Sequence, residues 1–231
     1  MPLPKIDQPL FTLTVPSSGK KVKYRPFTVK EEKILLIAQE SKDMEQIITA
    51  IKQIITNCLV DVDADDLAVF DLEYILIKLR AKSVNNVIDF KITDPDTEEE
   101  IDVSLNIDDI EIDYKEEHKK IIEVTDDISL HMKYPSIDYL NAAKDQASDE
   151  SVFNLMKQSI DKVVQGDSVY KLQDFTEKEV EEFVDSLGSH VITSIKTFFD
   201  TIPQMKFEHK YVDKEGNEKT FVAKGTETFF I

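Results

Sequence analysis

The chain has 231 residues, of which 41% are hydrophobic, and a formal net charge of −18. This length and hydrophobic fraction are sufficient for one large domain or two small ones, which excludes a disordered acidic tail. The negative charge argues against nucleic acid and against an anionic membrane as partners, because both attract Lys and Arg. No apolar run approaches the roughly 18–20 residues that span a bilayer, and the start of the chain lacks a secretion signal, so we expect a cytoplasmic protein.

Negative charge is concentrated between Asp89 and Asp127. This segment holds 16 acidic and 4 basic residues, a net charge of −12. Such a segment forms either a solvated face that keeps the protein soluble or a surface that docks a basic partner. The sequence leaves both interpretations open.

The N-terminal part predicts a β-hairpin followed by three helices. Two alternating segments flank PSSG in residues 10–24, and Gly19 can supply the turn between them. Thr28 and Glu31 have the T-x-x-E spacing of a capping box, which marks the start of the first helix. The third helix carries apolar side chains nearly all round and should therefore be central. The second and third helices are expected at about 43–59 and 67–82.

The middle of the chain predicts a small antiparallel sheet. Residues 87–92 and 101–107 alternate around the turn DPDTEEE, and the alternation continues through 110–114, 121–124 and 128–132.

The C-terminal part predicts helices and a closing hairpin. Helices are expected at 135–143, at 152–164 and from a second capping box, Thr176 with Glu179. Gly188 permits a break, and a last helix should stop at Pro203. The segments MKFEHKYV and KTFVAK then flank DKEGNE as a terminal hairpin.

Together these elements predict an α+β fold. It would consist of an N-terminal helical layer with small antiparallel β-hairpins, a central acidic β-sheet region, and C-terminal helices with a terminal hairpin. We expect three segments, packed as one compact unit or as two subdomains: residues 1–84, 85–133 and 134–231.

Patterns that suggest chemistry are incomplete. DVDADD at Asp61–Asp66 resembles the opening of a calcium loop, but Asp66 stands where glycine is needed and Leu72 where a bidentate Glu is needed. Helix capping by Asp65 or Asp66 is the better interpretation. The four histidines are scattered without the spacing of metal ligands, and the lone Cys58 lies in an apolar run, as expected for a small buried residue.

These observations predict a protein that is not an enzyme, with no catalytic, cofactor-binding or metal-binding residues. There is no glycine-rich phosphate loop and no G-x-S-x-G elbow. Abundant Asp and Glu leave a catalytic carboxylate pair as the enzymatic alternative, but nothing selects one pair over the others.

Charged and aromatic residues near the helical layer and at the C-terminus are candidate structural ties or interface residues. Glu73 and Arg80 are seven residues apart on one helix face, and a buried Arg usually needs a carboxylate partner. We expect ion pairs there and at Arg25, with an intersubunit anchor at Arg80 as the alternative. Phe229 and Phe230 should close the core or bind a partner, because each aromatic side chain buries about 150–250 Å².

Six sequence blocks resemble a known family. They are RPFTVKEEKILLIA, the TNCL after IKQII, FDLEYILIKLRAKSV, KYP, FFDTIPQM and KGTETFF, and they occur in the family's order over nearly the full chain. The chain is similar to the baseplate protein family of T-even-type (myovirus) bacteriophages, which is described as a baseplate hub subunit. The resemblance implies a non-enzymatic protein that helps to build the central hub of a contractile tail.

The resemblance also implies partners and a place in the cell. Partners would be other phage hub and tail proteins, and a homo-oligomer stays open. The protein would act in the host cytoplasm during assembly and, if retained, would lie in the tail baseplate of the virion. A transient assembly chaperone that is absent from the virion is one alternative, and an acidic inhibitor or decoy of a basic host protein is another.

One feature of the family is not carried over. Relatives often have cysteine pairs in the terminal hairpin, of the kind that binds zinc. The corresponding turn here is Asp213, Lys214, Glu215 and Gly216. The resemblance therefore implies no metal at this hairpin.

Overall fold

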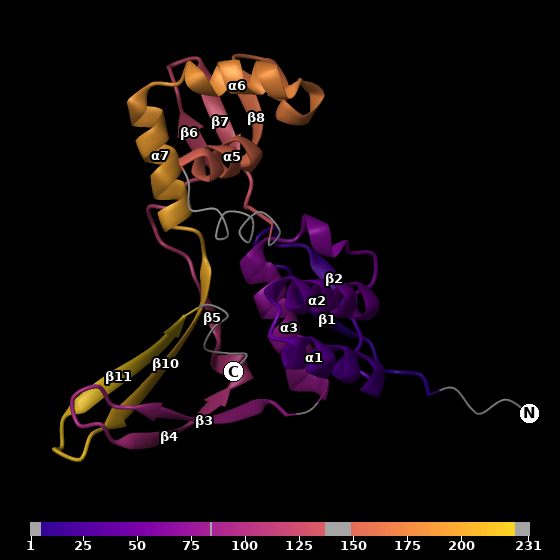
Figure 1. The fold of residues 1–231 in the computed structure, drawn as a ribbon, viewed down its shortest axis with the longest axis vertical. Helices are drawn as coiled ribbons and strands as arrows, with labels where there is room; N and C mark the ends of the chain where they lie inside the picture. Colours follow the sequence, from indigo (N-terminus) through magenta and orange to yellow (C-terminus); the bar gives the residue numbers. More distant parts are fainter. Residues whose placement is uncertain (1–5, 84, 137–148, 225–231) are drawn as a thin grey trace, which may run out of the picture. The chain divides into compact units, whose positions relative to one another are not determined.

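The computed structural model describes residues 6–83, 85–136 and 149–224. Its contacts divide the chain into two units. The first unit comprises Met1–Asp113 together with Gln204–Ile231, and the second unit comprises Tyr114–Pro203. Helices combine with small antiparallel sheets in both units (Figure 1), which confirms the predicted α+β class. The division into three consecutive segments stays a prediction.

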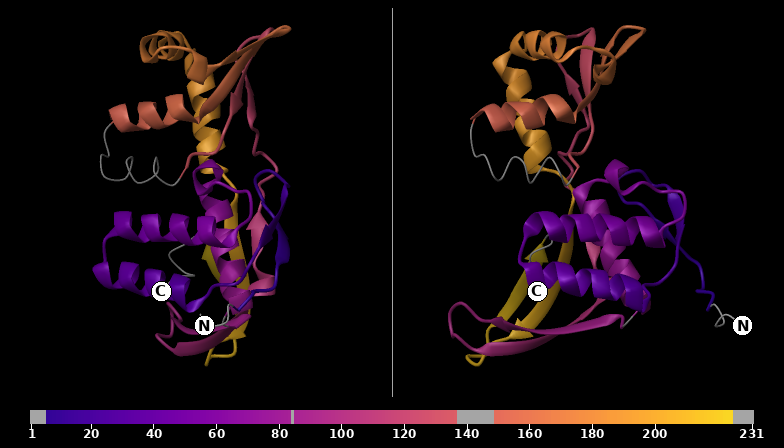
Figure 2. Two further views of the ribbon diagram at one scale, coloured as in Figure 1. Left: turned by 90° about the vertical axis from the view of Figure 1, so that its right-hand side faces the viewer. Right: turned by 45° about the vertical axis from the view of Figure 1, so that its right-hand side comes forward.

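The first unit begins with the expected hairpin and helices. Strands β1 (Phe11–Thr14) and β2 (Lys21–Tyr24) pair antiparallel, and Gly19 has a φ of +67° in the turn between them. Only glycine adopts this left-handed backbone without cost. The three predicted helices follow, of which α1 and α2 lie side by side in the views of Figure 2. They are α1 (Val29–Ser41), α2 (Met44–Cys58) and α3 (Val69–Ser83).

The start signals of these helices match local hydrogen bonds, with one correction. Asp43 caps α2 by accepting from the Glu45 backbone N–H at 2.9 Å. Asp65 and Asp66, which the sequence suggested as helix caps, lie inside the short 3₁₀ helix η1 (Ala64–Asp66), and Asp63 is the residue that caps it. The cap must lie one residue before the helix so that its carboxylate can reach the free N–H groups.

Helix α3 is central, as its apolar pattern predicted. Ile75, Leu76, Ile77 and Leu79 are almost completely buried. An apolar cluster joins α3 to the hairpins, because it contains Ile77 of α3 together with Val103 and Leu105. Those hairpins, which Figure 1 shows next to each other, are β3 (Val87–Thr93) with β4 (Glu100–Asn106), and β10 (Gln204–Val212) with β11 (Glu218–Lys224).

The middle of the chain does not form one sheet, contrary to the prediction. After the 3₁₀ helix η2 (Ile107–Asp109), strand β5 (Glu111–Asp113) pairs with β10, so that Ile112 lies opposite Met205. Strands β6 (Ile121–Glu123) and β7 (Ile128–Met132) belong to a different sheet in the second unit. Alternation shows that a segment is a strand, but it does not identify its neighbours.

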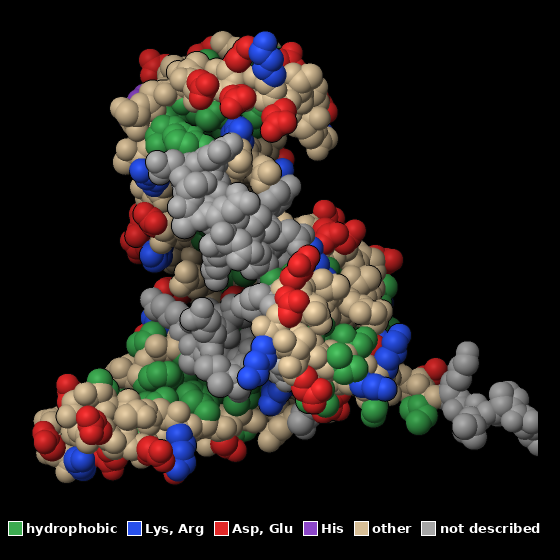
Figure 3. Space-filling view, in the orientation of Figure 1, with side chains coloured by type: hydrophobic (Ala, Val, Ile, Leu, Met, Phe, Trp, Pro, Cys, Tyr) green, Lys and Arg blue, Asp and Glu red, His purple; other side chains and the backbone are tan. Residues whose placement is uncertain are grey.

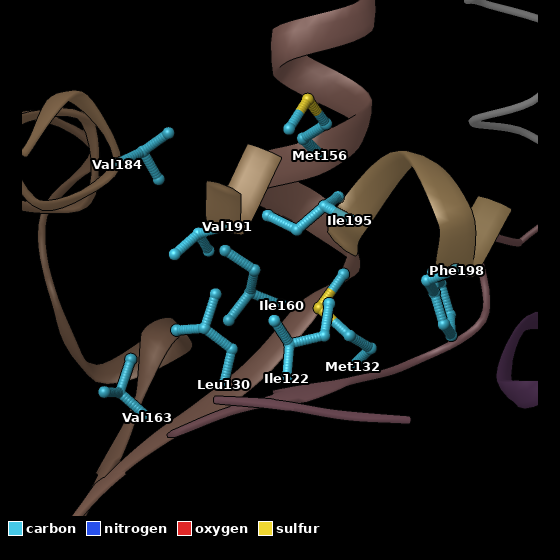
Figure 4. Close-up of a cluster of buried hydrophobic side chains, with 10 residues drawn as sticks. All are labelled: Ile122, Leu130, Met132, Met156, Ile160, Val163, Val184, Val191, Ile195 and Phe198. Atoms are coloured by element: carbon cyan, nitrogen blue, oxygen red, sulfur yellow. The ribbon is translucent and has the colours of Figure 1, made fainter. Parts of the chain in front are cut away.

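The second unit packs helices against a four-stranded antiparallel sheet. The strand order is β6-β7-β8-β9, and Figure 4 shows apolar side chains of the sheet and helices pointing toward one another, among them Leu130, Ile160 and Ile195. The remaining elements are α5 (Asp149–Ser159), β8 (Ile160–Gln165), β9 (Ser168–Lys171), the 3₁₀ helix η3 (Leu172–Asp174), α6 (Glu177–Asp185) and α7 (Ser189–Asp200).

Two C-terminal predictions need correction or fall outside the described residues. The helix expected at 152–164 ends at Ser159, and Ile160–Gln165 form strand β8 instead. The run contains β-branched Ile160, Val163 and Val164, which suit a pleated strand as well as a helix, and pairing with β7 decides between the two. Most of the helix expected at 135–143 lies outside the described residues, and Pro135 and Ser136 are not helical.

Candidate functional site

Arg25 is tied to Glu31 at the start of α1. The Arg25 guanidinium donates to both carboxylate oxygens of Glu31, at 3.2 and 3.0 Å. Thr28 donates to the same carboxylate through its backbone N–H, at 2.9 Å, and through its hydroxyl. Burial alone would raise the pKa of Glu31, but the hydrogen bonds from Arg25 and Thr28 outweigh it and lower the pKa to about 2. Arg25 is therefore an internal tie in this structure.

The other predicted tie residues lie in different surroundings. Glu73 is buried within α3, whereas Arg80 near the end of the same helix is exposed. Arg80 lines a surface hollow of about 580 Å³ together with Thr28 and Ser83. Pairing of Glu73 with Arg80, and an intersubunit role for Arg80, stay predictions. Phe229 and Phe230 lie outside the described residues.

A polar cluster that the sequence did not predict clasps the tips of two hairpins in the first unit. Lys219 Nζ lies 2.9 Å from both carboxylate oxygens of Asp94, 2.8 Å from Asp96 and 3.1 Å from Asp213. The Tyr211 hydroxyl donates to Asp94 at 2.7 Å. The carboxylates of Asp94 and Asp213 are fully buried, so this clasp binds β10 and β11 to the β3–β4 turn.

The clasp fixes the protonation of its members. The hydrogen bond from Lys219 is the main cause that lowers the pKa of Asp94. The backbone N–H of Asn217 is the main cause that lowers the pKa of Asp213, to about 2. Hydrogen bonds to Asp96 and Asp94 raise the pKa of Lys219. Asp94, Asp213 and Lys219 therefore keep their charges near neutral pH, which suits a structural role and not a group that exchanges protons.

His118 of the second unit is held in a neutral form. Its Nδ1 lies 2.9 Å from Thr201 Oγ1, and its Nε2 lies 3.0 Å from the Tyr134 hydroxyl. The Thr201 hydroxyl donates to the Thr197 carbonyl at 2.6 Å, so it accepts from Nδ1–H, and the Tyr134 hydroxyl donates to Nε2. Burial, and secondarily the charge of Lys120, lowers the pKa of His118.

Cys58 and the usual metal-ligand side chains form no metal-binding group within the described residues. The Cys58 thiol is buried, as predicted, and burial raises its pKa to about 11. Within residues 6–83, 85–136 and 149–224, no three His, Cys, Asp or Glu side chains gather as a metal site would require. Over the same ranges, no helix is long and apolar enough to cross a bilayer.

An apolar groove lies in the second unit between the sheet and α6. Its volume is about 500 Å³, and its apolar walls include Val163 of β8, Tyr170 of β9 and Phe175 after η3. Val180 and Phe183 of α6 form the opposite side, where Glu179 and Glu182 also line it. Figure 3 shows Asp and Glu side chains gathered over α6.

The sequence contained a signal for this groove that was missed. Gln165 pairs with Ser168, so Gly166 and Asp167 form a two-residue hairpin turn, and Gly166 has a φ of +53°. A Gly-Asp pair between alternating residues is a recognised hairpin signal. With it, β9 and the position of Tyr170 on the sheet could have been predicted.

The acidic segment 89–127 is divided between the two units, and several of its carboxylates have partners within the chain. Besides Asp94, Glu100 pairs with Lys91 at 2.8 Å, and Asp108 lies 3.4 Å from Lys78 and accepts from Asn86. These carboxylates therefore have partners within the chain, although the largely exposed Lys91–Glu100 pair contributes little to stability.

Comparison with known proteins identifies one family. The model of the family described as T4 bacteriophage base plate protein matches residues 8–231. No curated protein matches significantly, and neither does any solved structure. Because the family model covers nearly the whole chain, this protein belongs to the T4 bacteriophage base plate protein family.

Proposed function

We propose that this chain is a non-enzymatic structural or assembly protein of the central hub of a contractile-tail baseplate, and that it acts through protein–protein contacts. The observation that carries the proposal is the family match over residues 8–231. Family membership indicates a structural protein of the phage baseplate, whose partners are other tail and baseplate proteins. The hub role rests on the six sequence blocks, which resemble a baseplate protein family described as a hub subunit.

The described side chains support a role in binding. The clearest cluster of carboxylates, around Asp94 and Asp213, is saturated by Lys219 and by backbone N–H groups. Exposed apolar side chains, by contrast, include Tyr170 and Phe175 beside the groove in the second unit. Saturated polar clusters stabilise a scaffold, whereas concave apolar surfaces bind partners.

Co-expression tests the proposal directly. The full chain would be produced with each of the other baseplate proteins of its phage, and the complexes would be sized by light scattering after gel filtration. We expect a stable complex with at least one hub protein. A chain that stays alone with every hub protein, or that binds only proteins of the outer baseplate, would contradict the hub role.

Mass spectrometry of purified virions then separates two forms of this function. A hub subunit should be present in stoichiometric amount in finished particles. An assembly chaperone, which works in the host cytoplasm and leaves, should be found in assembly intermediates but not in virions.

A further inference from the structure

The groove in the second unit continues the core-facing side of the sheet. Leu130, Val163 and Tyr170 lie opposite one another on β7, β8 and β9. Cross-strand partners point to the same face, so these three side chains form one row. Their exposed fractions rise from 0% to 8% to 41% toward the edge strand. The core therefore buries the centre of this face but leaves the edge strand β9 partly exposed.

Aromatic side chains form the open end of the groove. The rings of Tyr170 and Phe175 lie 6.3 Å apart, and both side chains remain more than 40% exposed. The groove's volume of about 500 Å³ lies within the range of about 300–1,000 Å³ that is typical of binding pockets. One or two large apolar side chains of a partner could occupy it and bury these rings.

The charge of the groove indicates the kind of partner. Among the described residues that line it, the charged ones are both acidic, Glu179 and Glu182. Backbone and hydroxyl hydrogen bonds from Thr176 lower the pKa of Glu179, so it is an anion near neutral pH. Glu182 pairs with Lys178 at 3.6 Å, but both side chains are largely exposed, and such pairs contribute little. A second copy of this chain, with a net charge of −18, is a poor match for this rim.

We propose that this groove docks a short segment of another baseplate protein, in which a large apolar side chain is flanked by Lys or Arg. The apolar side chain would complete the row of Leu130, Val163 and Tyr170, and the basic residues would face Glu179 and Glu182. Apolar anchors supply most of the affinity of such contacts, whereas the charges select the partner and speed association. The proposal rests on the proposed function for its source of partners.

Two pairs of matched variants test the groove in the full chain. Tyr170→Ser removes an aromatic side chain that lines the groove. Its control is Val169→Ser, because the exposed Val169 precedes Tyr170 on β9 and its side chain points to the opposite face of the sheet. Glu182→Lys reverses a charge that lines the groove, and Glu181→Lys reverses the exposed charge beside it, which does not line the groove. Each variant would be checked by thermal melting, since all four sites are exposed and should leave the fold unchanged.

Dissociation constants would be measured by calorimetry for the complex found by co-expression, at about 50 and 200 mM salt. We expect Tyr170→Ser and Glu182→Lys each to weaken binding at least tenfold, and Val169→Ser and Glu181→Lys to change it less than twofold. Wild-type affinity should fall as salt rises, and Glu182→Lys should reduce that dependence.

Other outcomes overturn the proposal in distinguishable ways. If a complex forms and all four variants keep it, the groove is not the docking surface, although the proposed function stands. If Val169→Ser weakens binding as much as Tyr170→Ser, the edge of the sheet and not the groove is responsible. If the protein alone dimerises and Tyr170→Ser makes it monomeric, the occupant is a second copy. If no baseplate protein binds the wild-type chain, the proposed function fails as well.

Discussion

The two units of the molecule use carboxylates in opposite ways. Among the described residues, the first unit buries five acidic side chains, whereas the polar residues buried in the second unit are Ser159 and Thr201. The acidic rim of the second unit, at Glu179 and Glu182, is exposed. The buried acidic residues of the first unit are Glu31, Asp71, Glu73, Asp94 and Asp213.

This difference follows from the cost of burying a charge. A carboxylate removed from water must be paired with a cation or with N–H groups, as Glu31 is with Arg25 and Asp94 with Lys219. The first unit therefore adds specific polar pairs to its apolar core, whereas the described core of the second unit is held by apolar packing. The net charge of −18 thus combines internal ties with surface charge that is available to partners.

The largest effect is expected from the apolar core of the second unit. Phe198 is 1% exposed, and its ring centre lies 5.2 Å from that of His118 and 5.8 Å from that of Tyr134. Phe198→Ala should lower the free energy of unfolding by about 3–5 kcal/mol, because it removes a buried ring and leaves a cavity. Urea unfolding measures this loss. Phe199→Ala, at a half-buried neighbour, should cost clearly less, and equal losses would contradict the assignment of Phe198 to the core.

Breaking the Arg25 tie should have the next largest effect. Arg25→Ala leaves the buried carboxylate of Glu31 without its cation and should cost about 2–3 kcal/mol of unfolding free energy. This is below the cost for a fully buried pair, because the Arg25 side chain is 26% exposed. Urea unfolding of Lys33→Ala, an exposed residue of α1, provides the control and should differ from wild type by less than about 0.5 kcal/mol. Similar values for both variants would show that the tie contributes no stability.

Acidification should destabilise the two units at different pH values. His118 has a lowered pKa in the folded protein, so its contribution to stability is present above about pH 6.5 and is lost as pH falls below that value. Glu31 and Asp213, with pKa values of about 2, contribute stability above about pH 4.5 that is lost as pH falls toward 2. The second unit should therefore weaken first, and the first unit at lower pH.

Methyl NMR signals of Ile75 and Ile195, buried in the first and second unit, can follow the two events during urea titrations from pH 8 to pH 3. His118→Gln should remove the dependence that begins just below about pH 6.5 and keep the one at lower pH. Loss of both signals at the same urea concentration at every pH would contradict the difference between the units.

The smallest effect should be confined to the hairpin tips. Lys219→Met keeps most of the side-chain stem and removes the cation from Asp94 and Asp213. The effect should be local because both carboxylates keep their hydrogen bonds, Asp94 from the Tyr211 hydroxyl and backbone N–H groups and Asp213 from backbone N–H groups. We expect faster amide hydrogen exchange in the turns at 94–99 and 213–217, with little change in the helices. Lys210→Met, an exposed position on β10, is the matched control. Unchanged exchange at the tips would show that the clasp does not hold them.

Much of the local structure could be predicted from the sequence. The capping box of Thr176 with Glu179 is present in both directions, and Gly19 occupies the turn where it was expected. The candidate ties were less predictable. Arg25 was a candidate tie or interface residue, but nothing in the sequence pointed to the clasp around Lys219, because Asp94 and Lys219 are 125 residues apart.

Features whose hydrogen bonds close within a few residues, together with the apolar faces of the helices, follow from the local sequence. Long-range contacts, in contrast, determine that Ile160–Gln165 form a strand, that β5 pairs with β10, and that an apolar groove lies beside Tyr170. The physical reason is that β-branched apolar runs suit more than one local structure. Pairing and burial across long sequence separations then select the one that satisfies the backbone.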